Sequence, residues 1–146
     1  MSSKALRMTD APRPGDVLRY PYLWARQADL GETEGRKPRP CAVILTLQAD
    51  TERTELRLCA VTTQPPQPGT HAIEVPETEK RRAGLDVGLQ LWVIVDEHNV
   101  DVFEQSFYIE PHSHIGTFSS AFTKNLQSEM IVALRQRHSK SVLRRD

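Results

Sequence analysis

Apolar runs of strand length, broken by turns rich in proline, glycine and charge, constrain the fold of this chain more than any other feature. Such runs predict short β-strands, because turn residues end regular structure on both sides of each run. The predicted strands span residues 15–20, 41–47, 56–61, 71–75, 89–95 and 99–103. A turn at 49–54 joins the second strand to the third, so we expect these two to pair.

The last part of the chain has a different periodicity, with an apolar residue at every fourth position. The residues of this series are Phe122, Leu126, Met130 and Leu134, with Ala133 beside them. The spacing predicts one buried face of an amphipathic helix that begins at Ser119 or Ser120. Short strands followed by one helix predict a mainly β fold with a C-terminal helix. The expected form is a small, partly open barrel that the helix covers on one side.

Length and composition indicate one soluble domain. The chain has 146 residues, enough for one hydrophobic core, and no apolar run that could cross a bilayer. Its polar start lacks the apolar segment of a signal peptide, so we expect a cytoplasmic protein without a membrane partner. We predict a flexible lead-in over residues 1–14, one domain over 15–138 and a basic tail over 139–146. Residues 21–40 are expected to form a loop and 76–84 a short helical turn.

The formal net charge is zero, so bulk charge does not attract this chain to nucleic acid. Binding of a polyanion would therefore need a local patch. Basic clusters occur at Arg36, Lys37 and Arg39, at Lys80, Arg81 and Arg82, and in the C-terminal tail. A solvated surface or a frayed end is the alternative interpretation of each cluster.

Cys41 and Cys59 each begin an apolar run, which predicts two reduced core residues. A disulfide would suit a secreted protein, but nothing else in the sequence indicates secretion. A catalytic thiolate needs a cationic, partly exposed setting, and Cys41 lies two residues from Arg39. That possibility stays open for Cys41.

Two segments could form a site at one rim of the sheet. The first, GETEGRKPRP, leads into the strand CAVIL, and the second, CAVTTQP, ends a strand in polar residues. If the two strands are antiparallel, Arg39 lies near Thr62, and an Arg beside hydroxyl and amide donors suits a phosphate. The alternative is that Arg39 pairs with Glu34 and that Thr62 only ends a strand.

The order of these segments resembles the MazF/PemK family of toxin–antitoxin ribonucleases, from about Gly15 to the terminal helix. The resemblance is carried by the opening GDV, then EGRKPRPCAVIL, CAVTTQP and WVIVDEHN, and finally the closing helix. It implies a small SH3-like barrel, a homodimer, and a growth-inhibiting toxin that cuts single-stranded RNA and is held inactive by an antitoxin protein. The family's catalytic Arg and Thr then fall on Arg39 and Thr62. Glu34 matches an acidic loop residue of the family, and Gln64 completes the Thr-Thr-Gln segment.

The chain also departs from the family pattern. Its loop before Arg39 is longer and more basic, Asp96-Glu97 stands where many relatives have an acidic residue and a glutamine, and YPYLW extends the first strand. The family's RNA sequence preferences therefore do not transfer to this chain.

RNA carries its own nucleophile, the 2′-hydroxyl, so a ribonuclease of this kind needs no metal or other cofactor. Arg39 and Thr62 can stabilise charge on the phosphate, and Glu34 or His71 could accept the 2′-hydroxyl proton. The residues expected to bind RNA are Arg36, Lys37, Thr63, Tyr22 and Trp24. The two aromatic residues could stack on bases or plug the end of the barrel.

Two other interpretations remain open. His112 and His114 could share a zinc ion, although no third ligand is evident. The same barrel could also act without catalysis, by binding an antitoxin or poisoning a topoisomerase, because fold alone does not fix function.

Overall fold

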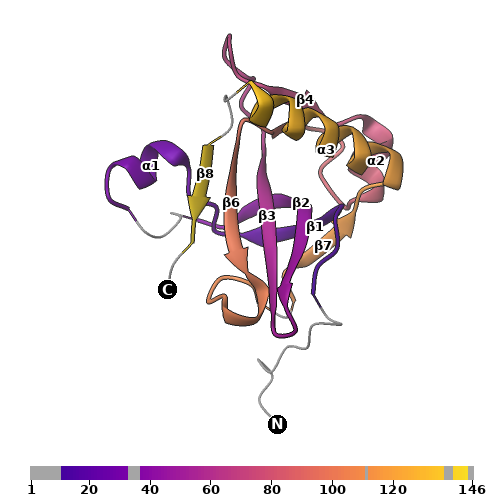
Figure 1. Ribbon diagram of the computed structural model, residues 1–146. Helices are drawn as coiled ribbons and strands as arrows, with labels where there is room; N and C mark the ends of the chain where they lie inside the picture. The colour runs from indigo at the N-terminus through magenta and orange to yellow at the C-terminus, as the bar shows by residue number, and fades with distance from the viewer. Residues whose placement is uncertain (1–10, 33–36, 111, 137–139, 145–146) are drawn as a thin grey trace.

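The fold is mainly β, with helices beside an eight-stranded sheet and α3 near the C-terminus (Figure 1). This computed structural model describes residues 11–32, 37–110, 112–136 and 140–144. The strands are β1 (Asp16–Tyr20), β2 (Arg39–Asp50), β3 (Arg53–Thr62), β4 (Ala72–Glu74), β5 (Trp92–Ile94), β6 (Glu97–Val102), β7 (His114–Thr117) and β8 (Lys140–Leu143). The helices are α1 (Ala25–Asp29), α2 (Glu77–Arg82) and α3 (Ser120–Arg135), with a 3₁₀ turn over Phe103–Gln105.

The main path of the sheet runs β4-β5-β3-β2-β1-β7, and β6 pairs with β3 away from this path. Every pairing is antiparallel except that of β8, which lies parallel to β6. The strands that the structure describes do not close into a barrel. The predicted mainly β fold with a C-terminal helix is confirmed, and so is the pairing of the second predicted strand with the third.

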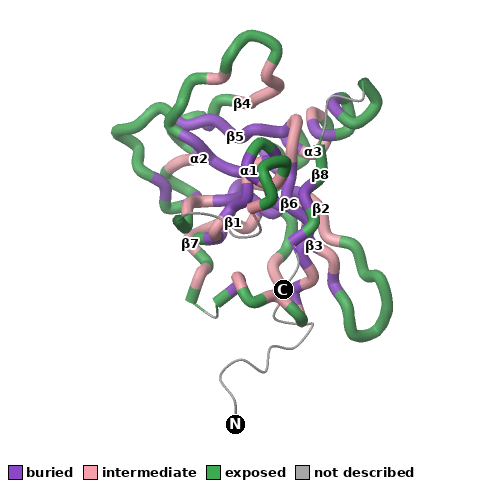
Figure 2. The backbone as a smooth tube through the Cα atoms, turned by 90° about the vertical axis from the view of Figure 1, so that its left-hand side faces the viewer, coloured by how far each residue is buried: buried purple, intermediate pink, exposed green. Residues whose placement is uncertain are grey.

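The core lies on both faces of the β2–β3 pair. Ala42 and Ile44 of β2 face a cluster that includes Phe122, Leu126 and Met130 of α3. Cys41 and Val43, which alternate with them along β2, face a second cluster around Tyr20 and Tyr22, as the two-residue period of a strand requires. Figure 2 shows buried residues, in purple, where β2 and β3 meet this core, whereas the tip of the β2–β3 hairpin is exposed.

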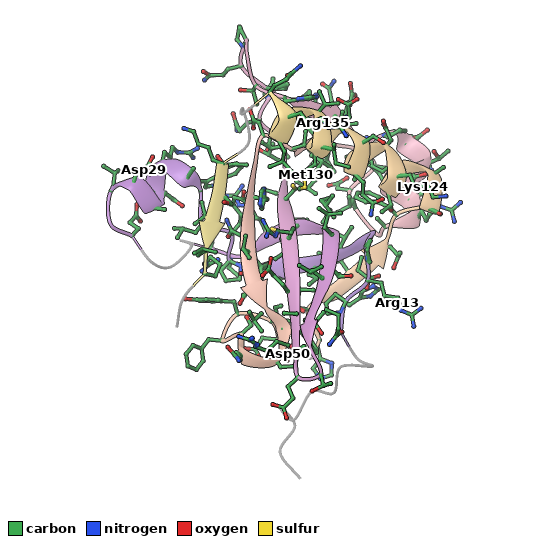
Figure 3. All side chains as sticks on the ribbon, in the orientation of Figure 1. Arg13, Asp29, Asp50, Lys124, Met130 and Arg135 are labelled. Atoms are coloured by element: carbon green, nitrogen blue, oxygen red, sulfur yellow. The ribbon has the colours of Figure 1, made fainter. Side chains whose placement is uncertain are left out.

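Helix α3 begins where the sequence predicts, because Ser119 Oγ accepts a hydrogen bond from the Phe122 N–H at 3.1 Å. Figure 3 shows Met130 pointing into the core, whereas Lys124 and Arg135 point away from it. The expectation for Leu134 is wrong, since this side chain is exposed and Ala133 is buried. Each step of four residues turns about 40° beyond a full helical turn, so the series leaves the buried face.

Two segments differ from the sequence-based expectation, and a third, 104–117, for which the sequence predicts no element, contains β7. The supposed loop 21–40 contains α1, and Arg39 already belongs to β2. Residues 140–143 were expected in a basic tail but form β8, because Val142 is buried against Leu23 and Ala25. Most of the predicted lead-in, residues 1–10, lies outside the described residues.

Both cysteines are free and fully buried, which confirms the interpretation as reduced core residues. Burial raises the pKa of both thiols, so neither is a ready thiolate at neutral pH. The described part of the chain has no helix long and apolar enough to span a membrane.

Candidate functional site

The start of β2 and the end of β3 lie at the same end of the central strand pair. Cys41 stands opposite Ala60 in the antiparallel register. Arg39 is the first residue of β2 and Thr62 is the last residue of β3, each two positions beyond that pair. The register therefore places Arg39 and Thr62 at one rim, as the sequence predicts for an antiparallel pair.

Arg39 reaches from this rim toward an aromatic wall. Its backbone stands opposite Tyr20 of β1, and its guanidinium carbon lies 5.3 Å from the centre of the Trp24 ring. Arg39 Nε is buried and has no hydrogen-bond partner among the described residues. A buried donor without a partner is costly, so a ligand acceptor that the Arg39 side chain turns to meet would stabilise this N–H.

Thr62 is nearly buried, with 7% of its surface exposed. Its Oγ1 accepts a hydrogen bond from the Gln64 N–H at 3.0 Å, which fixes the turn that ends β3. The hydroxyl hydrogen is not used in that contact and can still be donated. Thr63 and Gln64 are both exposed beside it.

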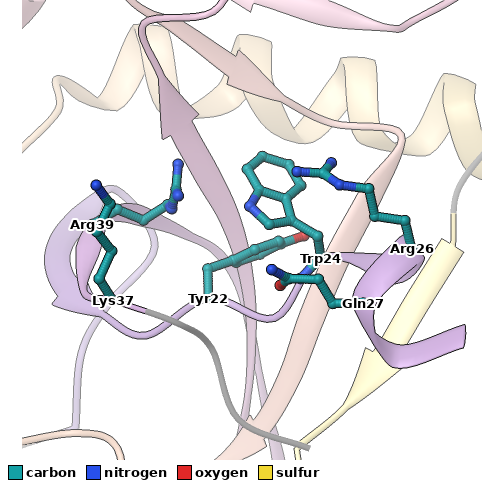
Figure 4. A pocket seen from close by; sticks show the side chains of 6 residues that line it. All are labelled: Tyr22, Trp24, Arg26, Gln27, Lys37 and Arg39. Carbon is teal, nitrogen blue, oxygen red and sulfur yellow. The ribbon is translucent and has the colours of Figure 1, made fainter. Parts of the chain in front are cut away.

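A pocket of ≈ 230 Å³ lies beside Trp24. The described residues that line it are Tyr22, Trp24, Arg26, Gln27, Lys37 and Arg39 (Figure 4). Arg26 also lies over the Trp24 ring, at 5.1 Å from its centre. The pocket thus combines several cations with an aromatic surface, a combination that suits the phosphates and bases of single-stranded nucleic acid.

The two aromatic residues predicted to bind RNA have different surroundings. Tyr22 is only 1% exposed, and its hydroxyl donates a hydrogen bond to Glu97 Oε1 at 3.1 Å, so it fills the end of the core as the alternative interpretation held. Trp24 is half-buried and packs edge-on against Tyr22, with ring centres 5.0 Å apart. Trp24 therefore presents the main aromatic surface of the pocket.

Arg26 and Gln27 are pocket residues that the sequence analysis missed, because it assigned residues 21–40 to a loop. Helix α1 has only five residues, too few to show a helical apolar period. One signal was available. Gln27 follows Trp24 by three residues and caps the helix, accepting a hydrogen bond from the Trp24 N–H at 3.1 Å.

Alternate side chains of β6 form hydrogen bonds to residues 20–25, the segment that carries Tyr22 and Trp24. Asp101 accepts a hydrogen bond from the Tyr20 hydroxyl at 2.7 Å. Asn99 accepts one from the Leu23 N–H at 2.9 Å and donates one to the Leu23 carbonyl at 2.7 Å. Glu97 accepts one from the N–H of Ala25 at 3.0 Å. We call Glu97, Asn99 and Asp101 the β6 polar row.

Arg144, just after β8, reinforces this attachment. Its Nη1 donates hydrogen bonds to the Pro21 carbonyl at 2.7 Å and to Asn99 Oδ1 at 3.1 Å. Its guanidinium carbon also lies 4.0 Å from the centre of the Tyr108 ring. The end of the chain therefore helps to position the pocket wall.

The β6 polar row carries two carboxyl groups that are partly shielded from solvent. Burial raises the pKa of Glu97 and of Asp101, although hydrogen bonds donated to each carboxylate oppose the shift. Burial also raises the pKa of Tyr22 well above its ordinary value. Glu97 lies behind Tyr22 rather than among the residues that line the pocket.

The candidate proton acceptors are not brought to the pocket among the described residues. His71 Nε2 lies 2.5 Å from Glu129 Oε2 on α3, and the His71 N–H donates to Asp96 Oδ2 at 3.1 Å. These contacts tie His71 to the helix side of the sheet. Glu34 and Arg36 lie outside the described residues.

The histidines considered for zinc lie apart from this pocket. His114 Nε2 lies 3.3 Å from Asp16 Oδ1 and 3.2 Å from Thr117 Oγ1, whereas His112 is exposed. No group of three or more potential ligands among His, Cys, Asp and Glu occurs in the part of the chain that the structure describes.

Comparison with known proteins adds no family assignment. No protein-family model matches the chain, and no curated protein matches it at a significant level. We therefore infer the function from the geometry of the rim and the pocket, together with the motif resemblance.

Proposed function

We propose that this protein is a metal-independent endoribonuclease of the MazF/PemK type, which cuts single-stranded RNA at the rim formed by Arg39 and Thr62. The observation that carries the proposal is the buried, unpartnered Nε of Arg39. It lies where β2 starts and β3 ends, next to a pocket of cations and an indole. A phosphate would supply the missing acceptor, and the neighbouring nucleotide would contact the pocket.

In this reaction the 2′-oxygen attacks the adjacent phosphorus and the bond from phosphorus to the 5′-oxygen breaks. The 2′-hydroxyl proton passes to a base and the departing 5′-oxygen gains a proton, which leaves a 2′,3′-cyclic phosphate and a free 5′-hydroxyl. Arg39 stabilises the charge that develops on the phosphate oxygens, and the Thr62 hydroxyl donates a further hydrogen bond. Glu34, in the segment before Lys37, remains the candidate base.

The wider assignment follows from the same proposal. The sheet is the core of a small SH3-like barrel, and the protein is a cytoplasmic type II toxin that forms a homodimer and pairs with an antitoxin protein. Support comes from the ordered motifs alone. Tyr22 and Leu23 are buried within the chain, so they offer no apolar surface to a second copy.

Incubation with long single-stranded RNA in excess EDTA tests the proposal. The chain should cut the RNA, and Arg39→Ala should reduce the rate by about 100-fold or more, the usual cost of losing a donor to transition-state charge. Thr62→Val keeps the side-chain shape, removes the hydroxyl and should also slow cleavage. Arg53→Ala removes an exposed Arg at the hairpin tip and serves as the matched control.

Undiminished cleavage by a folded Arg39→Ala variant would remove Arg39 from the site. RNA binding without any cleavage by the unmodified chain would favour the alternative of a non-enzymatic binding barrel.

A further inference from the structure

We propose that the pocket beside Trp24 is a subsite for a guanine base of single-stranded RNA, and that it selects guanine through the hydrogen-bond donors that dominate its described lining residues. The inference rests on the proposed function for the identity of the polymer. It adds a base preference that the motif resemblance does not supply.

The polar groups that line the pocket are mostly donors. Arg26, Lys37 and Arg39 carry N–H groups and no acceptor. Gln27 could offer both kinds of group, but its Oε1 already accepts one hydrogen bond from the Trp24 N–H, whereas its Nε2 amino group donates none to the described residues. Figure 4 shows the Gln27 amide directed toward the other lining side chains.

Acceptors are held away from the pocket. The hydroxyl of Tyr22 is directed at Glu97 Oε1, 3.1 Å away, on the core side of the ring. None of the described residues that line the pocket carries a carboxylate. A ligand that needs an acceptor from the protein therefore finds few on these side chains.

Guanine is the base that matches a set of donors. Its O6 and N7 are adjacent acceptors on one edge. Adenine places an amino donor beside N7, so it would face protein donors with a donor of its own. Cytosine has adjacent acceptors at N3 and O2, but its single ring offers less stacking area than a purine. Uracil offers one carbonyl on that edge, and so fewer hydrogen bonds than guanine.

The aromatic wall favours a base over a bare anion. The guanidinium carbons of Arg26 and Arg39 lie 5.1 and 5.3 Å from the centre of the Trp24 ring. Indole and planar guanidinium groups both stack on nucleobases, whereas a phosphate gains only charge contacts from them.

Equilibrium binding of mononucleotides tests the proposal without requiring cleavage. The probes are GMP, IMP, 7-deaza-GMP, AMP and CMP, with inorganic phosphate as competitor. All five nucleotides share a ribose and a phosphate, so differences in affinity report the base. Trp24 fluorescence, recorded in a Trp92→Phe background, provides the signal.

We expect GMP and IMP to bind equally, because both keep O6 and N7. AMP and 7-deaza-GMP should bind about 10-fold more weakly, within the usual range for a lost bidentate base contact. CMP should also bind more weakly than GMP, because its single ring stacks less. Equal affinity for the five nucleotides would overturn the proposal. Competition by inorganic phosphate at the same concentration as GMP would also overturn it, by identifying a simple anion site.

Gln27→Glu is the decisive variant, because it keeps an oxygen for the Trp24 N–H and replaces the amino donor by an acceptor. The preference for GMP over AMP should fall from about 10-fold toward unity. Arg82→Gln, which alters an exposed cation on α2, should leave the preference unchanged. A folded Gln27→Glu variant with the full preference would contradict the assignment.

If Gln27→Glu fails to fold, Arg26→Gln replaces it, since Arg26 is exposed and its loss should weaken GMP binding several-fold. Unchanged GMP affinity in that variant would contradict the proposal. Guanine-selective binding without RNA cleavage would sustain this inference and reject the proposed function. Cleavage without base-selective binding would do the reverse.

Discussion

Gly116 of β7 lies against the backbone that ends α2. A Cβ added at Gly116 would overlap the carbonyl oxygen of Ala83, and a backbone carbonyl cannot rotate away as a side chain can. Gly116→Ala should therefore lower the free energy of unfolding by about 2 kcal/mol or more. Chemical denaturation measures the change.

Gly88→Ala is the matched control for Gly116. The nearest neighbour of a Cβ added there is the side-chain oxygen Asp86 Oδ1 at 3.2 Å, which can move aside. An equal loss of stability in both variants would mean that the contact between β7 and α2 is not rigid.

His98 gives the fold a defined dependence on pH. It is 1% exposed, and burial together with the nearby Arg57 guanidinium lowers its pKa from 6.5 to about 4. The unfolded chain binds a proton near pH 6.5, whereas the folded chain does not bind it until about pH 4. The contribution of His98 to the free energy of unfolding should therefore be fully present above pH 6.5. It should fall as the pH drops toward 4, by about 3 kcal/mol in all.

Unfolding free energies of the unmodified chain and of His98→Gln, compared between pH 7 and pH 5, isolate this contribution. The variant should lose less stability on acidification, since it lacks the group that the unfolded chain protonates. His112→Gln, at an exposed position, should keep the original pH dependence. Parallel pH profiles for all three proteins would reject the role of His98.

At the scale of elements, the β6 polar row holds the segment between β1 and α1 in place. Asn99 is fully buried and satisfies both backbone groups of Leu23. Asn99→Ala leaves those groups and Arg144 Nη1 short of a partner, so it should cost about 2–4 kcal/mol of stability.

The same variant should weaken ligand binding in the pocket, because α1 carries Arg26 and Gln27. Asn125→Ala on the exposed face of α3 should be neutral or slightly stabilising, since Ala favours a helix. Denaturation of both variants measures the difference, and comparable stabilities would show that the row does not hold the segment.

Sequence periodicity predicted the elements whose burial follows a regular pattern. The pairing of β2 with β3 could be predicted because an apolar run and an alternating run flank a turn. Helix α3 could be predicted because its series is long. This pairing in turn places Arg39 and Thr62 at one rim.

The remaining elements depend on tertiary contacts that no local pattern records. Helix α1 has five residues, and β8 has a single buried side chain, Val142, among exposed neighbours. The β6 polar row alternates with Val100 and Val102, a pattern typical of a strand with one buried apolar face and one solvated polar face. Asn99 and Asp101 are buried as well, because they bind the backbone and a hydroxyl of the segment from β1.

At the scale of the whole molecule, the open sheet, α3 and the late strand β8 together support one rim. Helix α3 covers one face of the β2–β3 pair. The β6 polar row and β8 contact α1, and the pocket lies beside the start of β2. In the proposed reaction the substrate's own 2′-hydroxyl is the nucleophile, and that rim positions it.

One deoxyribose placed at the cleaved position of an otherwise ribose oligonucleotide tests this claim most directly. We expect the all-ribose strand to yield a 2′,3′-cyclic phosphate and a free 5′-hydroxyl, also in excess EDTA. We expect the singly substituted strand to bind but to stay intact, because the attacking oxygen is gone. Cleavage of the substituted strand at the same bond would mean that water attacks, and would contradict the proposed reaction.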